Sequence, residues 1–243
     1  MGIIYGKNPV YEAINANVTI NKIYAQTNIK EIDDVIKLAL KNKIIVVNTD
    51  KQKLDSMCEG KNSQGIVANV TEYKYFEVDD ILNYAKEKNE PPFIVILDKI
   101  EDPHNLGAIV RTCECMGVHG IIIQKRNACQ VTDTVEKVAA GACSLFKISR
   151  VTNICETIKY LKDNGLWIYG LDMDGDTKIY NNKFDGPIGL VIGNEGSGIT
   201  RLVKDNCDVS VSIPMSGKIN SLNASVSAAI SVYEVVRQKS MNK

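Results

Sequence analysis

The sequence has few of the residues that build metal sites or disulfide frameworks, and it has no excess of charge. It contains two histidines and seven cysteines, an odd number, and no two cysteines form a CxxC pair. We therefore expect reduced thiols in a cytoplasmic protein, and no metal site. The 29 basic and 29 acidic residues cancel, which argues against avid, non-specific binding to polyanions but leaves room for a local basic face.

Long apolar runs are also missing. No run approaches the ~20 residues that a membrane-spanning helix requires, and the first ten residues, MGIIYGKNPV, lack the apolar core of a signal peptide. We therefore expect no membrane partner. The chain has no internal repeats or low-complexity tracts, and its 243 residues, 44% of them hydrophobic, suffice for one large domain or two small ones.

The first part of the chain alternates helical and strand patterns, which predicts a small α/β domain over residues 1–72. Asn8 and Pro9 are suited to begin a helix that runs through Ile14, and Asp50 is suited to cap another. The remaining expected elements are a helix over 30–42 and strands over 19–25, 43–47 and 65–70. Residues 73–90 are charged, end near two prolines and form the expected linker, with a helix over 78–88.

The second domain is expected over residues 91–243, as an α/β fold with a mostly parallel sheet. The segment FIVILD (93–98) is nearly continuously apolar, as strands buried on both faces are. Strands alternating with helices place ligands at the carboxyl ends of the strands. Expected strands are 93–98, 120–124, 145–149, 166–172, 188–192 and 209–214, and expected helices are 106–116, 133–140, 153–163, 199–205 and 222–238.

The loop after FIVILD carries the first unusual motif, DKIEDPHNLGAIVR (98–111). Asp-Pro favours a turn, and Asn105 is suited to cap the following helix. Arg111 lies more than a turn further on, from where its long side chain can reach back toward the helix start. On the plain alternative, Asn105 is only a cap and Arg111 only a solvated charge.

The second motif, LVIGNEGSG (190–198), combines three glycines with an acid. Its spacing fits neither GxGxxG nor a P-loop, and no lysine follows the glycines. Glu195 would oppose a polyphosphate by roughly 1–4 kcal/mol, so these glycines are better suited to a flat ligand without phosphates, such as S-adenosylmethionine. On the alternative, the segment is a turn in which Glu195 stabilises a helix N-terminus.

The third motif, IPMSGKINSLNASVSAA (213–229), leads into a helix that opens with small residues. Ser221 is suited to be its N-cap. Asn223, expected in the first turn, is a mediocre helix former and is therefore a candidate for a contact. The small residues allow close approach of adenosine or of another backbone, although a tightly packed core helix would also use them.

Together, the pattern DPxNxGAxxRT, GxEGxG and SIPMxGxxxSLNxSxA resembles the SpoU or TrmH family of SPOUT-class 2′-O-ribose methyltransferases, over about residues 92–238. The resemblance implies a deep trefoil knot, a homodimer and S-adenosylmethionine as cofactor. It implies that Gly193, Ile213 and Leu222 line the adenosine pocket. The reacting centre that it implies consists of Asn105, Arg111, Glu195, Ser221 and Asn223.

The N-terminal domain resembles the substrate-binding domain of the RlmB-type subgroup, which is similar to ribosomal proteins that bind structured RNA. The matching positions are Gly6, Val10, Glu12, Ala13 and the segment QGIVA (64–68). Asn8 and Ser63 stand where many relatives have histidine, which leaves RNA contacts at those two points open. His104 lies at a variable position and is not expected to be catalytic.

The resemblance implies transfer of a methyl group to a ribose 2′-hydroxyl, most of all to a guanosine of large-subunit (23S) rRNA. Glu195 is expected to orient Arg111, which acts in its own pocket or in that of the partner subunit. Either Arg111 loses a proton transiently, or its cation lowers the pKa of the hydroxyl and clamps a phosphate. The second is favoured because guanidinium rarely releases a proton.

Other functions stay open at this point. They are a tRNA guanosine or rRNA adenosine 2′-O-methyltransferase, an RNA-binding protein without catalysis, and a Rossmann-type oxidoreductase, which the glycine spacing disfavours. Seven basic residues are candidates for RNA contacts, each also readable as a solvated charge: Lys7, Lys22, Lys61, Lys99, Lys125, Arg126 and Lys218.

Overall fold

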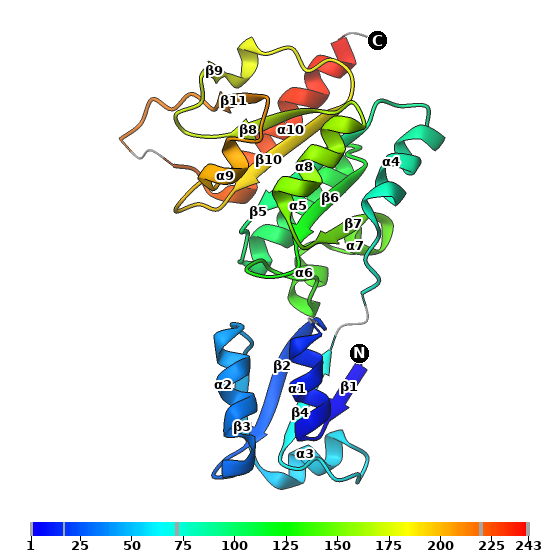
Figure 1. Ribbon diagram of the computed structural model, residues 1–243, viewed down its shortest axis with the longest axis vertical. Coiled ribbons are helices and arrows are strands. Elements are labelled where there is room, and N and C mark those ends of the chain that lie inside the picture. The colour runs from blue at the N-terminus through cyan, green and yellow to red at the C-terminus, as the bar shows by residue number, and fades with distance from the viewer. Residues whose placement is uncertain (1, 17, 71–72, 219–220, 242–243) are drawn as a thin grey trace. The chain divides into compact units, whose positions relative to one another are not determined.

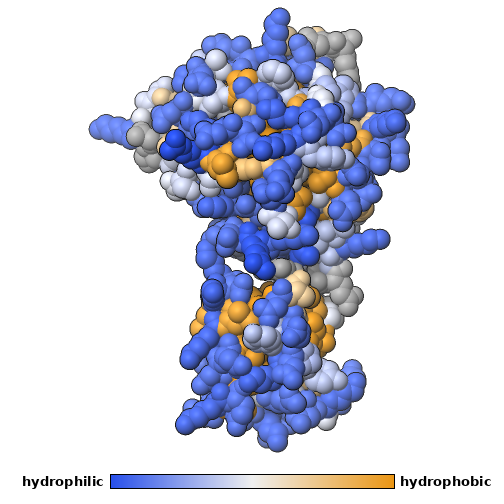
Figure 2. Space-filling model, in the orientation of Figure 1, coloured by the Kyte–Doolittle hydropathy of each residue, from blue (hydrophilic) through white to orange (hydrophobic). Residues whose placement is uncertain are grey.

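The computed structural model describes residues 2–16, 18–70, 73–218 and 221–241. Its contacts divide the chain into two compact units, Met1–Lys74 with Val131–Asp133, and Tyr75–Gln130 with Thr134–Lys243. Both are α/β (Figure 1), which confirms the predicted fold class. Hydrophilic residues cover most of each unit on the face shown in Figure 2. None of the described helices has both the length and the apolar character that crossing a membrane requires.

The N-terminal unit is a four-stranded sheet in the order β1-β4-β2-β3, with β4 antiparallel to both of its neighbours. Val10, Ile23, Val35 and Ile66 are fully buried in its core, and each stabilises the unit by roughly 1.5–3 kcal/mol. The elements are β1 (Gly2–Tyr5), α1 (Lys7–Asn15), β2 (Ile20–Gln26), the 3-10 turn η1 (Lys30–Ile32), α2 (Asp33–Lys41), β3 (Val46–Thr49), α3 (Lys51–Met57) and β4 (Ile66–Val70).

Two predicted boundaries in this unit are wrong. Helix α1 begins at Lys7 rather than after Asn8, because Gly6, with φ of 92°, is the N-cap and the Lys7 N–H donates to Oε1 of Gln64 at 2.9 Å. Strand β3 begins at Val46 rather than at Lys43, because Lys43 has a φ of 58° in the turn that ends α2. The cap at Asp50 is confirmed, since its side chain accepts from the Lys53 N–H at 2.8 Å.

The second unit contains a seven-stranded sheet in the order β7-β6-β5-β10-β8-β11-β9. Every pairing in it is parallel, as predicted. Its elements are α4 (Val78–Glu87), β5 (Phe93–Asp98), α5 (Pro103–Cys115), β6 (Gly120–Gln124), α6 (Asp133–Val138), α7 (Ala142–Leu145), β7 (Ile148–Val151), α8 (Ile154–Asp163), β8 (Trp167–Leu171), β9 (Thr177–Lys178), the 3-10 turn η2 (Ile179–Asn181), β10 (Ile188–Gly193), α9 (Arg201–Lys204), β11 (Val209–Ser212) and α10 (Ala224–Met241).

Helices cover both faces of this sheet (Figure 1). Ile94 and Ile96 of β5 share a buried cluster with α4, α8 and α9. Phe93 points to the opposite face, because side chains alternate along a strand, and Lys239 of α10 lies over its ring. Helices α5 and α10 pack against each other. A sheet covered on both faces explains why all six side chains of FIVILD are buried.

The strand predicted over 145–149 begins later in the structure, at Ile148. Residues 142–145 form α7, which starts after Gly141 in a left-handed conformation with φ of 88°, and β7 follows only at Ile148. The short apolar stretch did not distinguish one helical turn from a strand. Strands β1 and β9, of four and two residues, were not predicted.

Strand β11 lies between β8 and β9, which are consecutive along the chain. The β8–β9 connection passes close over β11, since a Cβ on Gly175 would lie 2.4 Å from the backbone carbon of Val211. This strand order is compatible with the expected trefoil knot. The knot itself stays a prediction. Ile219 and Asn220 of the third motif, and Thr71 and Glu72 at the expected domain junction, lie outside the described residues.

Candidate active site

The glycine-rich loop after β10 closes on itself. A Cβ on Gly193 would lie 2.1 Å from the backbone carbon of Gly198, so only glycine fits there. The Gly198 N–H donates to the backbone oxygen of Asn194 at 2.9 Å, and Oδ1 of Asn194 accepts from the N–H groups of Gly196 at 2.8 Å and Ser197 at 3.1 Å. The close contact of Gly193 with Gly198 and these hydrogen bonds thus hold the loop tightly closed.

The carboxylate of Glu195 is held by two side-chain amides. Nδ2 of Asn105 donates a short hydrogen bond to Oε1 of Glu195, and Nδ2 of Asn223 lies 3.4 Å from the same oxygen. Nδ2 of Asn223 also donates to Oδ1 of Asn105 at 2.9 Å. One residue from each of the three motifs therefore meets in a single cluster, in which bonds to a charged acceptor are stronger than neutral ones.

Asn105 is not the cap of α5, contrary to the prediction. Asp102 caps the helix by accepting from the His104 N–H at 2.7 Å, and Pro103 occupies the first turn, where its missing N–H is not needed. Asn105 lies within the first turn and is 6% exposed. Its amide is therefore free of the helix end and available to Glu195.

Asn223, and not Ser221, caps α10. Its Oδ1 accepts from the N–H groups of Ser225 at 3.0 Å and Val226 at 3.3 Å, and the helix begins at Ala224. The predicted cap at Ser221 is wrong because Asn223, which lies nearer the helix, caps it instead, and asparagine is as good a cap as serine. Asn223 uses its oxygen for the helix and its nitrogen for Glu195 and Asn105.

Arg111 stands apart from this cluster. Its side chain is exposed, and none of the ion pairs among the described residues joins it to Glu195. Six positions along a helix place Arg111 about 120° around the axis from Asn105. The predicted pair between Glu195 and Arg111 is therefore not formed within this chain.

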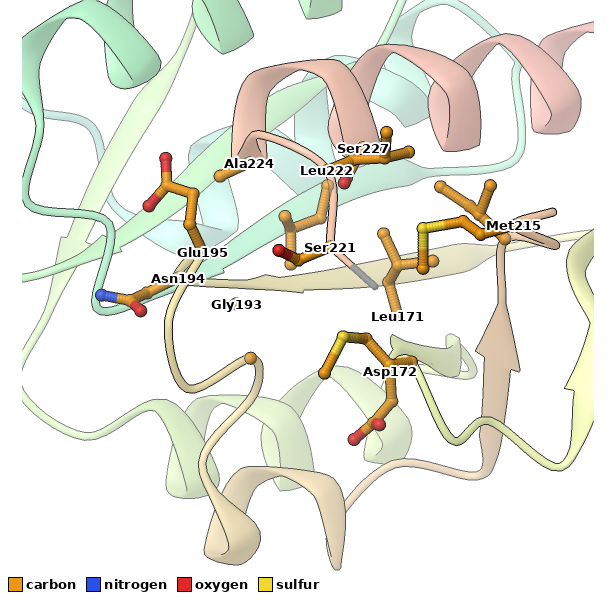
Figure 3. Close-up of a pocket in the computed structure, with 14 residues that line it drawn as sticks. Leu171, Asp172, Gly193, Asn194, Glu195, Met215, Ser221, Leu222, Ala224 and Ser227 are labelled. Carbon is orange, nitrogen blue, oxygen red and sulfur yellow. The ribbon is translucent and has the colours of Figure 1, made fainter. Parts of the chain in front are cut away.

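A pocket of about 580 Å³, open to solvent, lies beside Glu195 at the carboxyl ends of β8, β10 and β11 (Figure 3). Five predicted site residues line it, namely Gly193, Glu195, Ile213, Ser221 and Leu222. Figure 3 shows that Ser221 and Leu222 come from the segment before α10 and lie across from the Gly193 loop. The other described lining residues are Leu171, Asp172, Met173, Ile192, Asn194, Gly198, Met215, Ala224 and Ser227.

The pocket lining carries two acids, and none of its described residues is basic. Asp172 forms an ion pair with Lys204 at 2.9 Å. Burial opposes ionisation of Asp172, but the Lys204 ammonium and the Asp174 N–H together outweigh it and lower the pKa of this carboxyl. Such a lining suits a neutral or cationic ligand better than a polyphosphate. Asp172 was not predicted, although it directly follows the strand pattern LWIYGL.

Asp98 is a further unpredicted member of this region. It ends β5 in register with Gly193, is 1% exposed, and its Oδ2 accepts from the Thr200 N–H at 2.7 Å. Its other oxygen has no hydrogen-bond partner among the described residues. Asp98 thereby ties the far end of the Glu195 loop to the strand that leads to Asn105. An acid that ends a wholly apolar strand was the available signal.

Comparison with known proteins assigns both halves of the chain. Residues 92–233 match the SpoU rRNA methylase family, and residues 3–76 match the domain described as RNA 2′-O ribose methyltransferase substrate binding. A Bacillus subtilis protein, YacO, assigned to the TrmH family of tRNA/rRNA methyltransferases, is 43% identical over 238 residues, covering 97% of this chain and 95% of its own.

Solved structures share the fold. The SpoU methyltransferase AviRb from Streptomyces viridochromogenes, solved with AdoMet, aligns with a TM-score of 0.63 at 23% identity, over 98% of this chain and 90% of its own. The TrmH/SpoU tRNA modifying enzyme of A. aeolicus aligns with a TM-score of 0.58 at 26% identity, over 67% of this chain and 86% of its own. These matches confirm the resemblance inferred from the three motifs: the chain belongs to the SpoU, or TrmH, family of RNA methyltransferases.

Proposed function

We propose that the protein transfers a methyl group from S-adenosylmethionine to the 2′-hydroxyl of a ribose in structured RNA, most of all in a guanosine of large-subunit rRNA. The observation that carries the proposal is the cluster of Asn105, Glu195 and Asn223 at the rim of the pocket. It joins amide donors and a carboxylate, groups that position a hydroxyl, beside a pocket suited to a cofactor without phosphates.

The pocket fits S-adenosylmethionine by its chemistry. Gly193 lines the pocket where its loop closes on Gly198, and Ile213 and Leu222 add apolar surface for a flat base. Asp172 and Glu195 suit the positive charge of a sulfonium. When bound, the cofactor supplies a methyl group that is already activated for transfer. The residues around it therefore need to bind and orient the ribose and to assist loss of the hydroxyl proton.

Within this arrangement we assign Ser221, Asn105 and Asn223 to positioning the ribose, with Glu195 holding the two amides in place. Arg111 carries the charge: its guanidinium lowers the pKa of the hydroxyl and binds an adjacent phosphate. We favour this over transient loss of a proton from Arg111, because a guanidinium rarely releases a proton. A pH–rate profile that Arg111→Lys leaves unchanged in shape and rate would exclude a special role for the guanidinium.

A homodimer is part of the proposal, because Arg111 does not reach the Glu195 cluster of its own chain. Helix α5, which carries Arg111, packs against α10, and α10 exposes Val226, Ile230 and Tyr233 along one face. Pairing of this face with a second copy would bury the apolar stripe and bring Arg111 to the partner's pocket. Sedimentation of the purified protein tests this. A monomer with full activity would contradict it.

The rRNA substrate is favoured by the N-terminal unit, which matches the substrate-binding domain. The alternatives are a tRNA guanosine, an rRNA adenosine, or RNA binding without catalysis.

All seven cysteines are free thiols, which fits an RNA-modifying protein of the reducing cytoplasm.

The test is incubation with labelled S-adenosylmethionine and either unmodified large-subunit rRNA or bulk tRNA, followed by digestion to nucleosides. Label in 2′-O-methylguanosine from rRNA, lost in Arg111→Ala, is the expected result. Label in tRNA would keep the chemistry and change the substrate. If the protein binds S-adenosylhomocysteine and RNA but labels neither RNA, the catalytic proposal fails.

A further inference from the structure

The pocket and the Glu195 cluster lack a basic side chain among their described residues. An RNA strand that brings a ribose to this site also brings phosphates, which need positive charge near them. The loops around the pocket must supply it, together with Arg111. The candidate basic residues lie in different parts of the structure. Their positions favour one side of the large sheet as the RNA-binding side.

Of the seven basic residues singled out in the sequence, three belong to the N-terminal unit. Lys7 is one of these and is paired with Asp34 at 3.1 Å. Lys218 follows β11. The remaining three, Lys99, Lys125 and Arg126, lie on two neighbouring loops at the carboxyl edge of the large sheet, directly after β5 and β6.

These two loops are close to the reacting centre. Strand β5 pairs with β10, which leads to Glu195, and β6 is the next strand beyond β5. Strands are spaced by ~4.8 Å, so the loop after β6 begins roughly 10 Å from the end of β10. That is a reach of one or two nucleotides along an RNA strand.

The loops are also held in place by hydrogen bonds. The Lys99 N–H donates to Oε1 of Gln124 at 3.2 Å, and the Cys129 N–H donates to the backbone oxygen of Ile100 at 2.7 Å. Nε2 of Gln130 donates to the backbone oxygen of Gln124 at 2.9 Å. Lys99 also has a φ of 56°, an uncommon conformation that such a framework supports.

The loops after β5 and β6 differ in charge from the loop after β8, which lies on the other side of β10. Residues 125–130 include Lys125 and Arg126 and no acid, and the side chains of both are exposed. No ion pair among the described residues includes either of them. The loop after β5 carries two exposed acids, Glu101 and Asp102, beside Lys99, and Asp102 caps α5. The net positive charge of this edge therefore comes from residues 125–130.

On the other side, the loop after β8 carries Asp172, Asp174 and Asp176 within five residues. Lys204 pairs with Asp172, while Asp174 and Asp176 are exposed. A phosphate backbone is therefore repelled on the β8 side of Glu195 and attracted on the β6 side.

We propose that Lys125 and Arg126, with Lys99 beside them, bind the phosphates of the RNA strand that flanks the reacting ribose. The strand then approaches over the ends of β5 and β6 and stays off the acidic loop after β8. Arg126 offers two parallel N–H donors to a phosphate, and the two lysines act as point charges. This inference rests on the proposed function, because it assigns a path to the RNA of that reaction.

The experiment measures RNA affinity as a function of salt for the full-length protein. The probes are in-vitro-transcribed large-subunit rRNA and an in-vitro-transcribed tRNA, each from about 20 to 200 mM salt. The variant is K125Q/R126Q. Its matched control is K86Q/K159Q, which removes two positive charges from exposed positions on α4 and α8. A second pair, D174N/D176N, tests the acidic side.

Each lost phosphate contact lowers the salt slope by ~0.7–0.9. We expect K125Q/R126Q to lower it by about 1–2 and to weaken RNA binding roughly tenfold, with S-adenosylhomocysteine affinity unchanged. The control should keep the wild-type slope, and D174N/D176N should bind RNA at least as tightly as wild type. Equal slopes for K125Q/R126Q and its control would overturn the inference, as would a wild type that binds neither RNA at low salt.

Failure of the proposed function gives a different result. If K125Q/R126Q reduces the salt slope of RNA binding but wild type forms no methylated nucleoside, phosphate binding by these residues is supported and methyl transfer is contradicted. If wild type transfers the methyl group and K125Q/R126Q leaves the salt slope unchanged, methyl transfer is supported and phosphate binding by these residues is contradicted.

Discussion

The side-chain amides of Asn105 and Asn223 are hydrogen-bonded to each other at 2.9 Å although 118 positions separate them in the sequence. Asn105 lies in the first turn of α5, and Asn223 directly precedes α10. Because α5 and α10 pack together, this pair fixes the starts of two adjacent helices relative to Glu195. The packing of these two helices therefore also sets the geometry of the reacting centre.

Asn223 has two separable roles, so two substitutions should have different effects. Asn223→Ala removes the helix cap and should lower the free energy of unfolding by about 1 kcal/mol, and it should also abolish most activity. Asn223→Ser retains a capping oxygen but not the amide donor. Its stability should stay near wild type while methyl transfer falls at least tenfold, since about 1.4 kcal/mol of positioning energy is tenfold in rate. Urea unfolding and single-turnover kinetics measure the two effects. A fully active Asn223→Ser protein would contradict the assignment.

Gly193→Ala should disrupt the loop that carries Glu195. The added Cβ would lie 2.1 Å from the backbone of Gly198, so the loop must open. We expect binding of S-adenosylhomocysteine, measured by calorimetry, to weaken at least tenfold. Gly196→Ala is the control in the same loop, because its Cβ would meet Oδ1 of Asn194 at an ordinary 3.5 Å. Equal affinities for the two variants would refute the packing argument.

Asp98 should matter as a hydrogen-bond acceptor. Asp98→Ala leaves the Thr200 N–H without its partner in a buried place, which costs about 1–3 kcal/mol, and it releases the end of the Glu195 loop. Asp98→Asn keeps an acceptor for Thr200 and should therefore lose less stability than Asp98→Ala, although its Nδ2 takes the place of a buried oxygen that has no described partner. Urea unfolding of the three proteins checks the order. Equal losses in both variants would mean that the carboxylate charge itself is needed.

His119 should make stability depend on pH. Burial lowers the pKa of its imidazole below the ordinary 6.5, and the Glu90 carboxylate at 3.2 Å only partly opposes this. The unfolded chain therefore takes up a proton at a higher pH than the folded one. This contribution to stability is complete above about pH 6.5 and decreases as the pH falls below it. Urea unfolding at pH 7.5 and pH 5 should show a smaller pH-dependent loss in His119→Gln than in wild type. Parallel losses would assign the effect to other groups.

Much of the fold was predictable because local chemistry and long-range packing agree. FIVILD is apolar at every position before Asp98 and forms the buried strand β5, which pairs with β10 beside the site, and Asp50 caps its helix as expected. Where the prediction failed, two residues competed for one role. Asp102 and Asn105 both suit an N-cap, and Pro103 decides for Asp102. Asn223 and Ser221 competed in the same way before α10.

The long-range part was not accessible in the same way. The residues next to Glu195 in the sequence do not predict that it contacts Asn105 and Asn223 rather than Arg111. The order of the strands decides which loops are neighbours. Family resemblance selected these residues, and the contacts among them required the structure. Asp98 and Asn194 carry no signal beyond a polar residue at the end of an apolar strand.

The place of β11 between β8 and β9 also bears on synthesis of the protein. A ribosome releases β8, β9 and β10 before β11, so β9 has no neighbour in the sheet until β11 has emerged and paired with β8. The segment after β10 brings Ile213, Ser221, Leu222 and Asn223. A nascent chain therefore has no complete pocket until this segment has emerged and β11 has joined the sheet. The pocket is completed by residues that are synthesised after all of β8, β9 and β10.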